Sequence, residues 1–157
     1  MTEQVPNLDP RLAINPSSAQ VEVFLAGDQS APVTFLNLHR YFEHARYPRE
    51  CDVPSAERNV SGREAYHRYL REVAVRFLPQ VGAQFLMVRR AELVFIGGEE
   101  WHEVVIGHYP SRAAAMRLSA LDGYEQIAIH RLAGLEAAMT LVLGEHDTFG
   151  PAGVMIG

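Results

Sequence analysis

Hydrophobic and polar residues alternate most clearly over residues 33–41, VTFLNLHRY. Successive side chains of a β-strand point to opposite faces of its sheet. One face of this segment then carries Phe35 and Asn37, and the other carries Leu36 and Leu38. Because both sets hold large apolar residues, we predict a core strand whose two faces are both covered.

A second run, residues 101–109 (WHEVVIGHY), is rich in β-branched and aromatic residues and predicts a buried strand. Ser111 then suits the N-cap of a helix. Asp122 and Glu125 are spaced as a capping box, which predicts that a helix restarts there. Gly134 is a typical residue just past a helix end, so we place the end of this helix at that position.

Capping residues indicate two further helices. Asn15 followed by Pro16 is a typical helix start, and Gly27 is a typical stop. Ser61 and Glu64 form another capping box, ahead of apolar residues at helical spacing. Three apolar segments typical of strands complete the pattern: residues 84–88, residues 93–96 before a Gly-Gly turn, and residues 139–143.

The predicted order of core elements is strand, helix, strand, strand, helix, strand, preceded by one extra helix. This order is typical of a split βαβ sandwich, so we predict an α+β, ferredoxin-like βαββαβ fold with a four-stranded antiparallel sheet. We assign an arm and short helix to residues 1–31, the α+β domain to residues 32–144 and a tail to residues 145–157. The polar segment 47–60 is long for a loop, which suits either a lid or a disordered segment.

Two stretches of the chain resemble the family known as domain of unknown function 1330. One is WHEVVIGHYPSRAA with the tyrosine-containing helix that ends in HRLAGLE, and the other is FLNLHRY at 35–41 with the later helix that holds Tyr66 and Tyr69. The resemblance extends over residues 32–143. It implies a ferredoxin-like unit that dimerises through its sheets as a dimeric α+β barrel. The family brings no settled chemistry, so the residues have to be argued on their own.

Length and composition narrow the function classes. The 157 residues, 48% hydrophobic and 21% charged, suit one globular domain. The formal net charge of −5 argues against a general nucleic-acid binder. We expect no membrane span, since no run of 18 residues is apolar, and no secretory signal. The single cysteine, Cys51, excludes an internal disulfide framework and favours a cytoplasmic protein.

Strand order suggests where polar side chains could meet. In this fold the first and third strands form the central pair, and we expect them to run parallel, with their C-terminal ends at one edge of the sheet. A small-molecule pocket would combine the polar and aromatic groups at that edge. The residues that we expect to share it are Asn37, His39, Arg40, Tyr66, Tyr69, His108 and Tyr109.

Each of these groups also has a structural interpretation. His39 and His108 could be partly buried histidines satisfied by local hydrogen bonds. The buried amide of Asn37 needs a partner, which could be a ligand, a helix terminus or a neighbouring side chain. His130 and Arg131 close the last helix, where cations interact favourably with the helix dipole. Arg131 could instead anchor a carboxylate through its fork of donors.

The sequence holds no established metal or cofactor motif. It has no HxH, no HExxH and no cysteine cluster. His102 and His108 lie six residues apart on one strand, about 20 Å at ~3.3 Å per residue, so they cannot bind one ion. Nucleotide-binding glycine motifs and a GxSxG elbow are also absent. We therefore predict no metal and no cofactor; a metal site would need a distant pair such as His39 with His108.

Three functions remain open. The first is a cofactor-free enzyme of the dimeric α+β barrel type, acting on a small polar or aromatic molecule, with His39 or His108 as acid and base and Arg40 or Arg131 holding an anionic group. The second is a metabolite binder that uses the same pocket without catalysis. The third is a structural dimeric protein. We predict a homodimer in each case, because a sheet with two apolar faces needs a second covering layer.

Overall fold

A four-stranded antiparallel sheet, in the order β2-β3-β1-β4, forms the centre of the structure. The computed structural model describes residues 12–144. The predicted tail, residues 145–157, and most of the predicted arm lie outside them. The predicted α+β, ferredoxin-like order is confirmed, with an extra helix ahead of the first strand. The strands are β1 (Val33–Tyr41), β2 (Gln84–Arg90), β3 (Glu103–Tyr109) and β4 (Leu135–Leu143).

The two central strands, β1 and β3, run antiparallel, so the expectation that they run parallel is wrong. The helix after β1 returns the chain to its starting end, so β2 runs in the direction of β1, and the β2–β3 connection then reverses it. His39 therefore pairs with Glu103, at one end of β3, whereas His108 pairs with Thr34. The C-terminal ends of β1 and β3 therefore lie at opposite ends of the sheet, measured along the strand direction.

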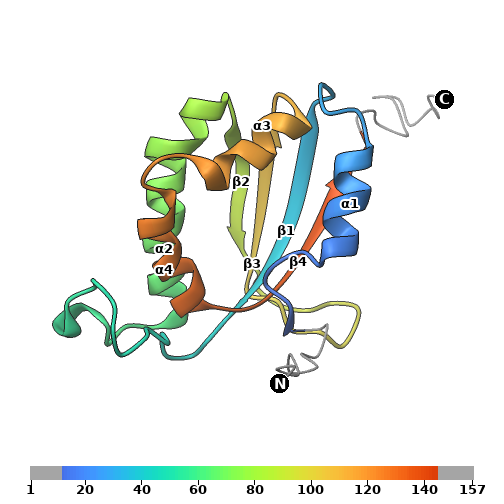
Figure 1. The fold of residues 1–157 in the computed structure, drawn as a ribbon. Helices are drawn as coiled ribbons and strands as arrows, with labels where there is room; N and C mark the ends of the chain where they lie inside the picture. Colours follow the sequence, from blue (N-terminus) through green and yellow to red (C-terminus); the bar gives the residue numbers. More distant parts are fainter. Residues whose placement is uncertain (1–11, 145–157) are drawn as a thin grey trace, which may run out of the picture.

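Two long helices, α2 (Gly62–Glu72) and α4 (Tyr124–Gly134), lie side by side over one face of the sheet (Figure 1). The Ser61 hydroxyl accepts a hydrogen bond from the Glu64 amide at 3.0 Å, so the predicted cap of α2 is present. The helix continues as a π-helical turn, Val73–Phe77, and a 3₁₀ turn, Leu78–Val81. Its apolar stripe joins the core through Tyr66, Tyr69 and Leu70.

Backbone contact between two glycines sets how closely α2 and α4 approach. A Cβ on Gly134 would lie 2.7 Å from the Tyr66 nitrogen and closer still to the Gly62 carbonyl oxygen. A Cβ on Gly62 would collide with the carbonyl oxygens of Phe42 and Gly134. Gly134 is the last residue of α4, as its position in the sequence predicts. Its lack of a side chain also permits this crossing.

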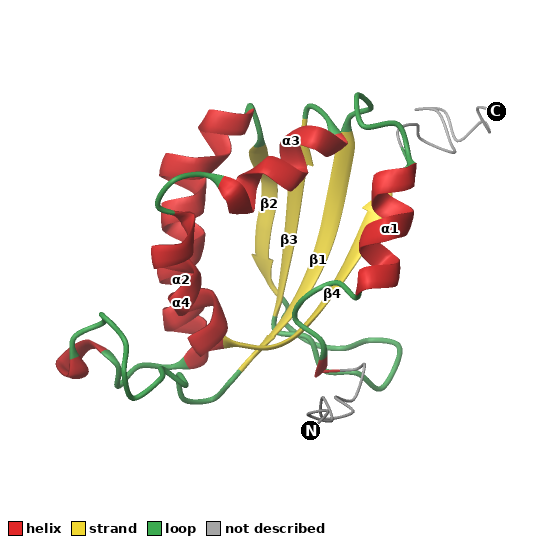
Figure 2. Cartoon of the chain, viewed as in Figure 1, coloured by secondary structure: helices red, strands yellow, loops and turns green. Residues whose placement is uncertain are grey.

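Two shorter helices, α1 (Ser18–Ala26) and α3 (Arg112–Arg117), complete the helical layer (Figure 2). Gly27 ends α1 as predicted, but the helix begins after Ser17, which forms a capping box with Gln20. Ser111 caps α3 as predicted. The predicted capping box at the start of α4 is absent, because Gly123, with a φ of 88°, turns the chain into that helix instead.

Residues 91–102 connect β2 to β3 and contain no strand, contrary to the prediction for 93–96. Ala91 and His102, at its two ends, still form backbone hydrogen bonds, to each other and from His102 to His39, whereas residues 93–96 belong to no strand. Phe95 and Ile96 are 90% and 87% exposed. Apolar character alone therefore does not make a strand here, because a strand also needs a neighbour for its ladder.

The two faces of the sheet are covered unequally. The helix-facing side carries Val33, His39 and Tyr41 from β1, and α1 joins this side through the contact between Phe24 and Phe35, whose ring centroids are 5.8 Å apart. The opposite side, which we call the open face, contributes nothing to the hydrophobic core of the described residues. Its apolar residues include Leu36, Leu38, Val104, Ile106, Met139, Leu141 and Leu143. Within the described residues only the helix-facing side is covered, so the predicted cover of the second face by another copy of the chain stays a prediction.

Candidate functional site

A cavity of about 140 Å³ lies between the helix-facing side of the sheet and the helices α2 and α4. It combines side chains from β1, β3, β4 and both helices with Ile14 from the segment before α1. Six of the predicted site residues line it: Asn37, His39, Tyr66, Tyr69, Tyr109 and Arg131. The cavity therefore lies over the middle of β1, not at the predicted edge.

His39 stands at the wall of this cavity and is only 4% exposed. Its Nε2 lies 3.4 Å from the Tyr66 hydroxyl, whose ring packs against the imidazole. Its Nδ1 is buried and has no hydrogen-bond partner within residues 12–144. Burial, together with the positive charge of Arg131, lowers the pKa of His39 to about 4. The imidazole is therefore neutral at neutral pH and has one unused ring nitrogen.

Arg131 is the cation of the cavity wall and comes from the last turn of α4. Its guanidinium donates hydrogen bonds to the Ile14 carbonyl and, at 3.1 Å, to the Asn15 side-chain oxygen. Within the described part of the chain no carboxylate lies within ion-pair distance of it. The N-terminal segment thus holds this cation in place without neutralising its charge.

Asn37 and Tyr69, two other polar residues of the wall, have protein partners. The Asn37 amide donates to the Val105 carbonyl at 3.0 Å and accepts from the Thr140 hydroxyl at 2.8 Å. The Tyr69 and Tyr124 hydroxyls are 2.6 Å apart. The Asn37 amide is only partly buried. Of the three expected kinds of partner, a neighbouring side chain is observed, and the Val105 carbonyl is a partner that was not expected.

His108 and Arg40, both expected in the pocket, lie on the open face. Side chains alternate along β1 and β3, so these two residues point away from His39. The His108 ring contacts the Thr34 hydroxyl at 2.9 Å. Arg40 forms an ion pair with Glu136 at 2.8 Å. Neither lines the cavity, and a metal site shared by His39 and His108 is excluded by their positions at opposite ends of β1 and β3.

His130 also lies away from the cavity, next to the loop after β1. Its Nδ1 is 2.7 Å from the Tyr47 hydroxyl, which also accepts a hydrogen bond from Arg68 at 3.3 Å. Burial, with the nearby charge of Arg68, lowers the pKa of His130. Of the two predicted site residues His130 and Arg131, only Arg131 lines the cavity. Adjacent side chains of a helix point about 100° apart, so the two cannot face the same site.

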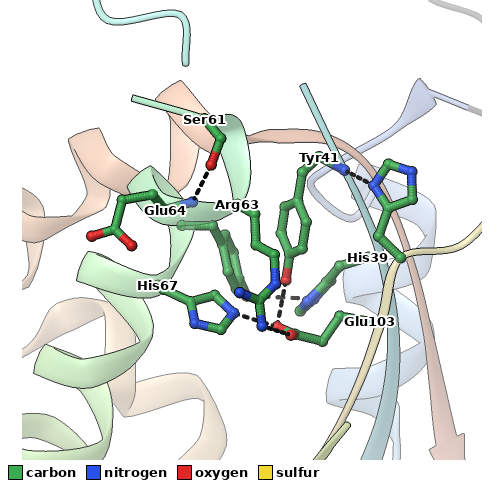
Figure 3. A network of polar contacts seen from close by, with 9 residues as sticks. His39, Tyr41, Ser61, Arg63, Glu64, His67 and Glu103 are labelled. Atoms are coloured by element: carbon green, nitrogen blue, oxygen red, sulfur yellow. Dashed lines mark hydrogen bonds and ion pairs between the residues drawn. The ribbon is translucent and has the colours of Figure 1, made fainter. Parts of the chain in front are cut away.

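A buried carboxylate that sequence reasoning missed lies next to His39 (Figure 3). Glu103 is 1% exposed and accepts hydrogen bonds from the Tyr41 hydroxyl at 2.8 Å, His67 Nε2 at 2.7 Å and Arg63 at 3.0 Å. Burial raises the pKa of Glu103, but the hydrogen bonds from Tyr41 and His67 outweigh it and hold the pKa below its usual value.

Alternation offered a signal for this group. Glu103 shares its face of β3 with Val105 and Tyr109, so a charged residue stands in an otherwise buried set. Arg63 and His67 are four residues apart and so lie on one face of α2. The pairing between these two elements could not be read from spacing, since it depends on how α2 lies on the sheet.

The loop at 47–60 folds around one side chain. The Arg58 guanidinium donates hydrogen bonds to the carbonyls of Val53, Cys51 and Arg49, at 2.7 to 3.0 Å. Val53 is buried, whereas the Cys51 thiol is free and partly exposed. A disordered loop is not what the structure shows, and opening and closing of the loop around a ligand stays a prediction.

The family model for a domain of unknown function, DUF1330, matches residues 56–145. The chain belongs to this family. A crystal structure of a protein of unknown function from Rhodopseudomonas palustris is 29% identical, covers 85% of this chain and 97% of its own, and has a TM-score of 0.72. The methylated form of that protein, also 29% identical, covers 87% and 97% and has a TM-score of 0.74.

A third solved structure is more distant. It is a Dabb-family protein with a ferredoxin-like fold from Mesorhizobium loti, 12% identical, covering 74% of this chain and 98% of its own, with a TM-score of 0.43. No curated protein matches the chain at a significant level. The predicted family resemblance is therefore confirmed, and the DUF1330 family brings no assigned activity with it.

Proposed function

We propose that this DUF1330 protein binds a small polar molecule in the cavity over β1, as a cofactor-free enzyme in which His39 is the acid–base group. The unpartnered Nδ1 of His39 carries this proposal. Buried polar atoms are nearly always hydrogen-bonded, and one without a partner costs about 1–3 kcal/mol. His39 lines the cavity, so the proposal assigns the missing partner to a polar group of the bound ligand.

The protonation state of His39 suits this role. A neutral imidazole has one donor and one acceptor nitrogen. If Nε2 carries the hydrogen and donates it to the Tyr66 oxygen, Nδ1 has a free lone pair that can accept a proton. If the Tyr66 hydroxyl donates to Nε2 instead, Nδ1 carries the hydrogen and can donate it to a ligand oxygen. Glu103, beside it on β3, would stabilise the imidazolium formed in the first case.

A non-catalytic binder is the second candidate, and the protein partners of Asn37 and Tyr69 favour it. These contacts leave His39, Arg131 and Tyr109 among the polar residues of the wall that could meet a ligand. Such a site could recognise a metabolite without transforming it.

A larger hollow, about 380 Å³, lies beside the open face, but apolar residues such as Leu93, Phe95 and Ile96 line it. We assign that surface to protein contacts.

A fragment screen tests cavity binding. Ligand-observed NMR with small polar fragments would be run on the wild-type protein and on Ala138→Leu, which fills the cavity wall. Fragments that bind only the wild type identify the cavity as a site. Absence of any such difference, with Ala138→Leu folded by its melting curve, would overturn the proposal. A fragment bound equally by both proteins has a different site.

We also propose that the protein is a cytoplasmic homodimer that associates through the open face. Support comes from the apolar side chains on that face, of which Met139 and Leu141 are 46% and 48% exposed. A soluble monomer rarely exposes a contiguous apolar patch of more than several hundred Å². No helix of the described residues is long and apolar enough to cross a membrane.

A further inference from the structure

We infer that the ligand of this cavity is a small organic monoanion, a carboxylate that also carries a hydroxyl group, bound between Arg131 and His39. The inference rests on the cavity binding proposed above and names the class of molecule.

The charge of the cavity wall favours an anion. Arg131 is the one formally charged residue of the lining, and no aspartate or glutamate among the described residues belongs to it. His39 is neutral, so it does not add to the positive charge. A guanidinium beside a half-enclosed cavity attracts a carboxylate more strongly than the same group does in open water, because the local dielectric constant is lower.

Arg131 is prepared for this contact. Two of its five N–H groups are used by the Ile14 carbonyl and the Asn15 side chain, which fix the plane of the guanidinium. Both partners are neutral, so no carboxylate within residues 12–144 compensates the charge. The remaining donors are available for a carboxylate, and little side-chain entropy is lost when one binds.

His39 supplies the second contact and thereby the second feature of the ligand. His39 lines the cavity, and its buried Nδ1 has no hydrogen-bond partner among the described residues. A ligand hydroxyl group can serve either tautomer, since it both donates and accepts. A simple fatty acid would satisfy Arg131 but leave Nδ1 unpaired. Discrimination should therefore come from the hydroxyl, because a site built to bind a hydroxyl rejects a ligand without one.

The cavity size limits the rest of the molecule. At about 140 Å³ it is far smaller than a nucleotide or flavin site. A cavity of roughly 150 Å³ accommodates benzene, so the ligand has on the order of six to eight non-hydrogen atoms. Tyr66, Tyr109 and Leu118 provide apolar contacts for its carbon chain.

Calorimetry with three matched probes tests the inference: 3-hydroxybutyrate, its neutral amide 3-hydroxybutyramide, and butyrate. We expect 3-hydroxybutyrate to bind roughly tenfold or more tightly than either of the others. Equal binding of the acid and the amide would remove the anion from the proposal, and equal binding of the acid and butyrate would remove the hydroxyl. No binding of 3-hydroxybutyrate at millimolar concentration would overturn it entirely.

Variants assign the two contacts. Arg131→Gln should reduce 3-hydroxybutyrate binding to the level of the amide, whereas Arg117→Gln, which removes a positive charge outside the cavity lining, should retain it. His39→Phe should abolish the preference over butyrate. If Arg131→Gln does not fold, Arg131→Lys, which keeps the charge and loses the fork, should bind with intermediate affinity. Wild-type affinity in Arg131→Gln would refute the role of this residue.

The outcomes separate this inference from the proposed function. Fragments that occupy the cavity but are all neutral would refute the anion and leave cavity binding intact. A cavity that takes no fragment, in the Ala138→Leu comparison, would refute both.

Discussion

At the scale of single residues, His39 and Glu103 are two neighbouring buried ionisable groups, of which one is neutral and the other charged. Glu103 has three donors and stays charged. His39 has one distant partner and an unused nitrogen, so it stays neutral. Burial penalises the charged form of both groups, and the difference lies in the hydrogen bonds that oppose the penalty.

The neutral state of His39 predicts acid sensitivity. Burial lowers its pKa from 6.5 to about 4, so the unfolded chain binds a proton more readily and stability falls as the pH drops through that range. A pKa difference of this size corresponds to at most about 3 kcal/mol. Urea denaturation at pH 7 and pH 4.5 should show a smaller loss in His39→Gln than in wild type. An equal loss would contradict the assignment, since His130 acts the same way in both proteins.

The buried carboxylate predicts a large loss of stability on neutralisation. Glu103→Gln replaces the buried carboxylate that accepts from the Tyr41 hydroxyl, His67 and the half-exposed Arg63 guanidinium with an amide that has a single acceptor oxygen, which should cost roughly 1–3 kcal/mol in the free energy of unfolding. Glu136→Gln is the matched control, because Glu136 is 36% exposed and its ion pair with Arg40 should be worth less than about 1 kcal/mol. Denaturant titrations at pH 7 measure both. Similar losses would mean that burial does not strengthen the Glu103 contacts.

At the scale of elements, the crossing of α2 and α4 decides where Tyr66, Tyr69 and Arg131 face the sheet. The helices meet at Gly62 and Gly134, backbone against backbone. A side chain there would push α4 outward and carry Arg131 with it. The glycines therefore position the cavity wall although they do not line it.

This crossing predicts that Gly134→Ala is destabilising by roughly 1–3 kcal/mol or more, because the backbone of α2 cannot yield as a side chain can. Gly98→Ala is the control, since nothing lies within 4 Å of a Cβ at that position. Thermal melts of both variants give the comparison. A Gly134→Ala protein as stable as Gly98→Ala would show that the two helices can separate at no cost.

At the scale of the whole molecule, one sheet face is packed under helices and the other is open. The loop 91–102 adds exposed apolar side chains near the open face. Apolar burial contributes about 25 cal/mol per Å² before the costs of association are subtracted, so covering both copies of such a face would favour the proposed dimer.

The open face predicts a dimer that one charge disrupts. Sedimentation at micromolar concentration should give twice the chain mass of 17.5 kDa. Leu141→Glu should yield a monomer, whereas Leu132→Glu, on α4 with 47% exposure against 48% for Leu141, should remain dimeric. A wild-type monomer would refute the association, and a dimeric Leu141→Glu would move the interface away from the sheet.

The sequence by itself determined the elements and their faces. Alternation predicted β1 with its observed bounds and placed Asn37 and His39 on one side of it, because side-chain direction in a strand depends only on position along the chain. Serine caps located the starts of α2 and α3 for an equally local reason. Apolar runs were weaker guides, as residues 93–96 show.

Only the tertiary structure decided which side chains meet. The direction and register of β3 against β1 placed Glu103, and not His108, beside His39. The contact of Gly62 with Gly134 brought Arg131 over the sheet, and the segment at Ile14 fixed its guanidinium. These contacts join residues tens of positions apart. Local periodicity predicts which way a side chain points. The partners of that side chain depend on how whole helices and strands pack, and residue spacing does not encode this packing.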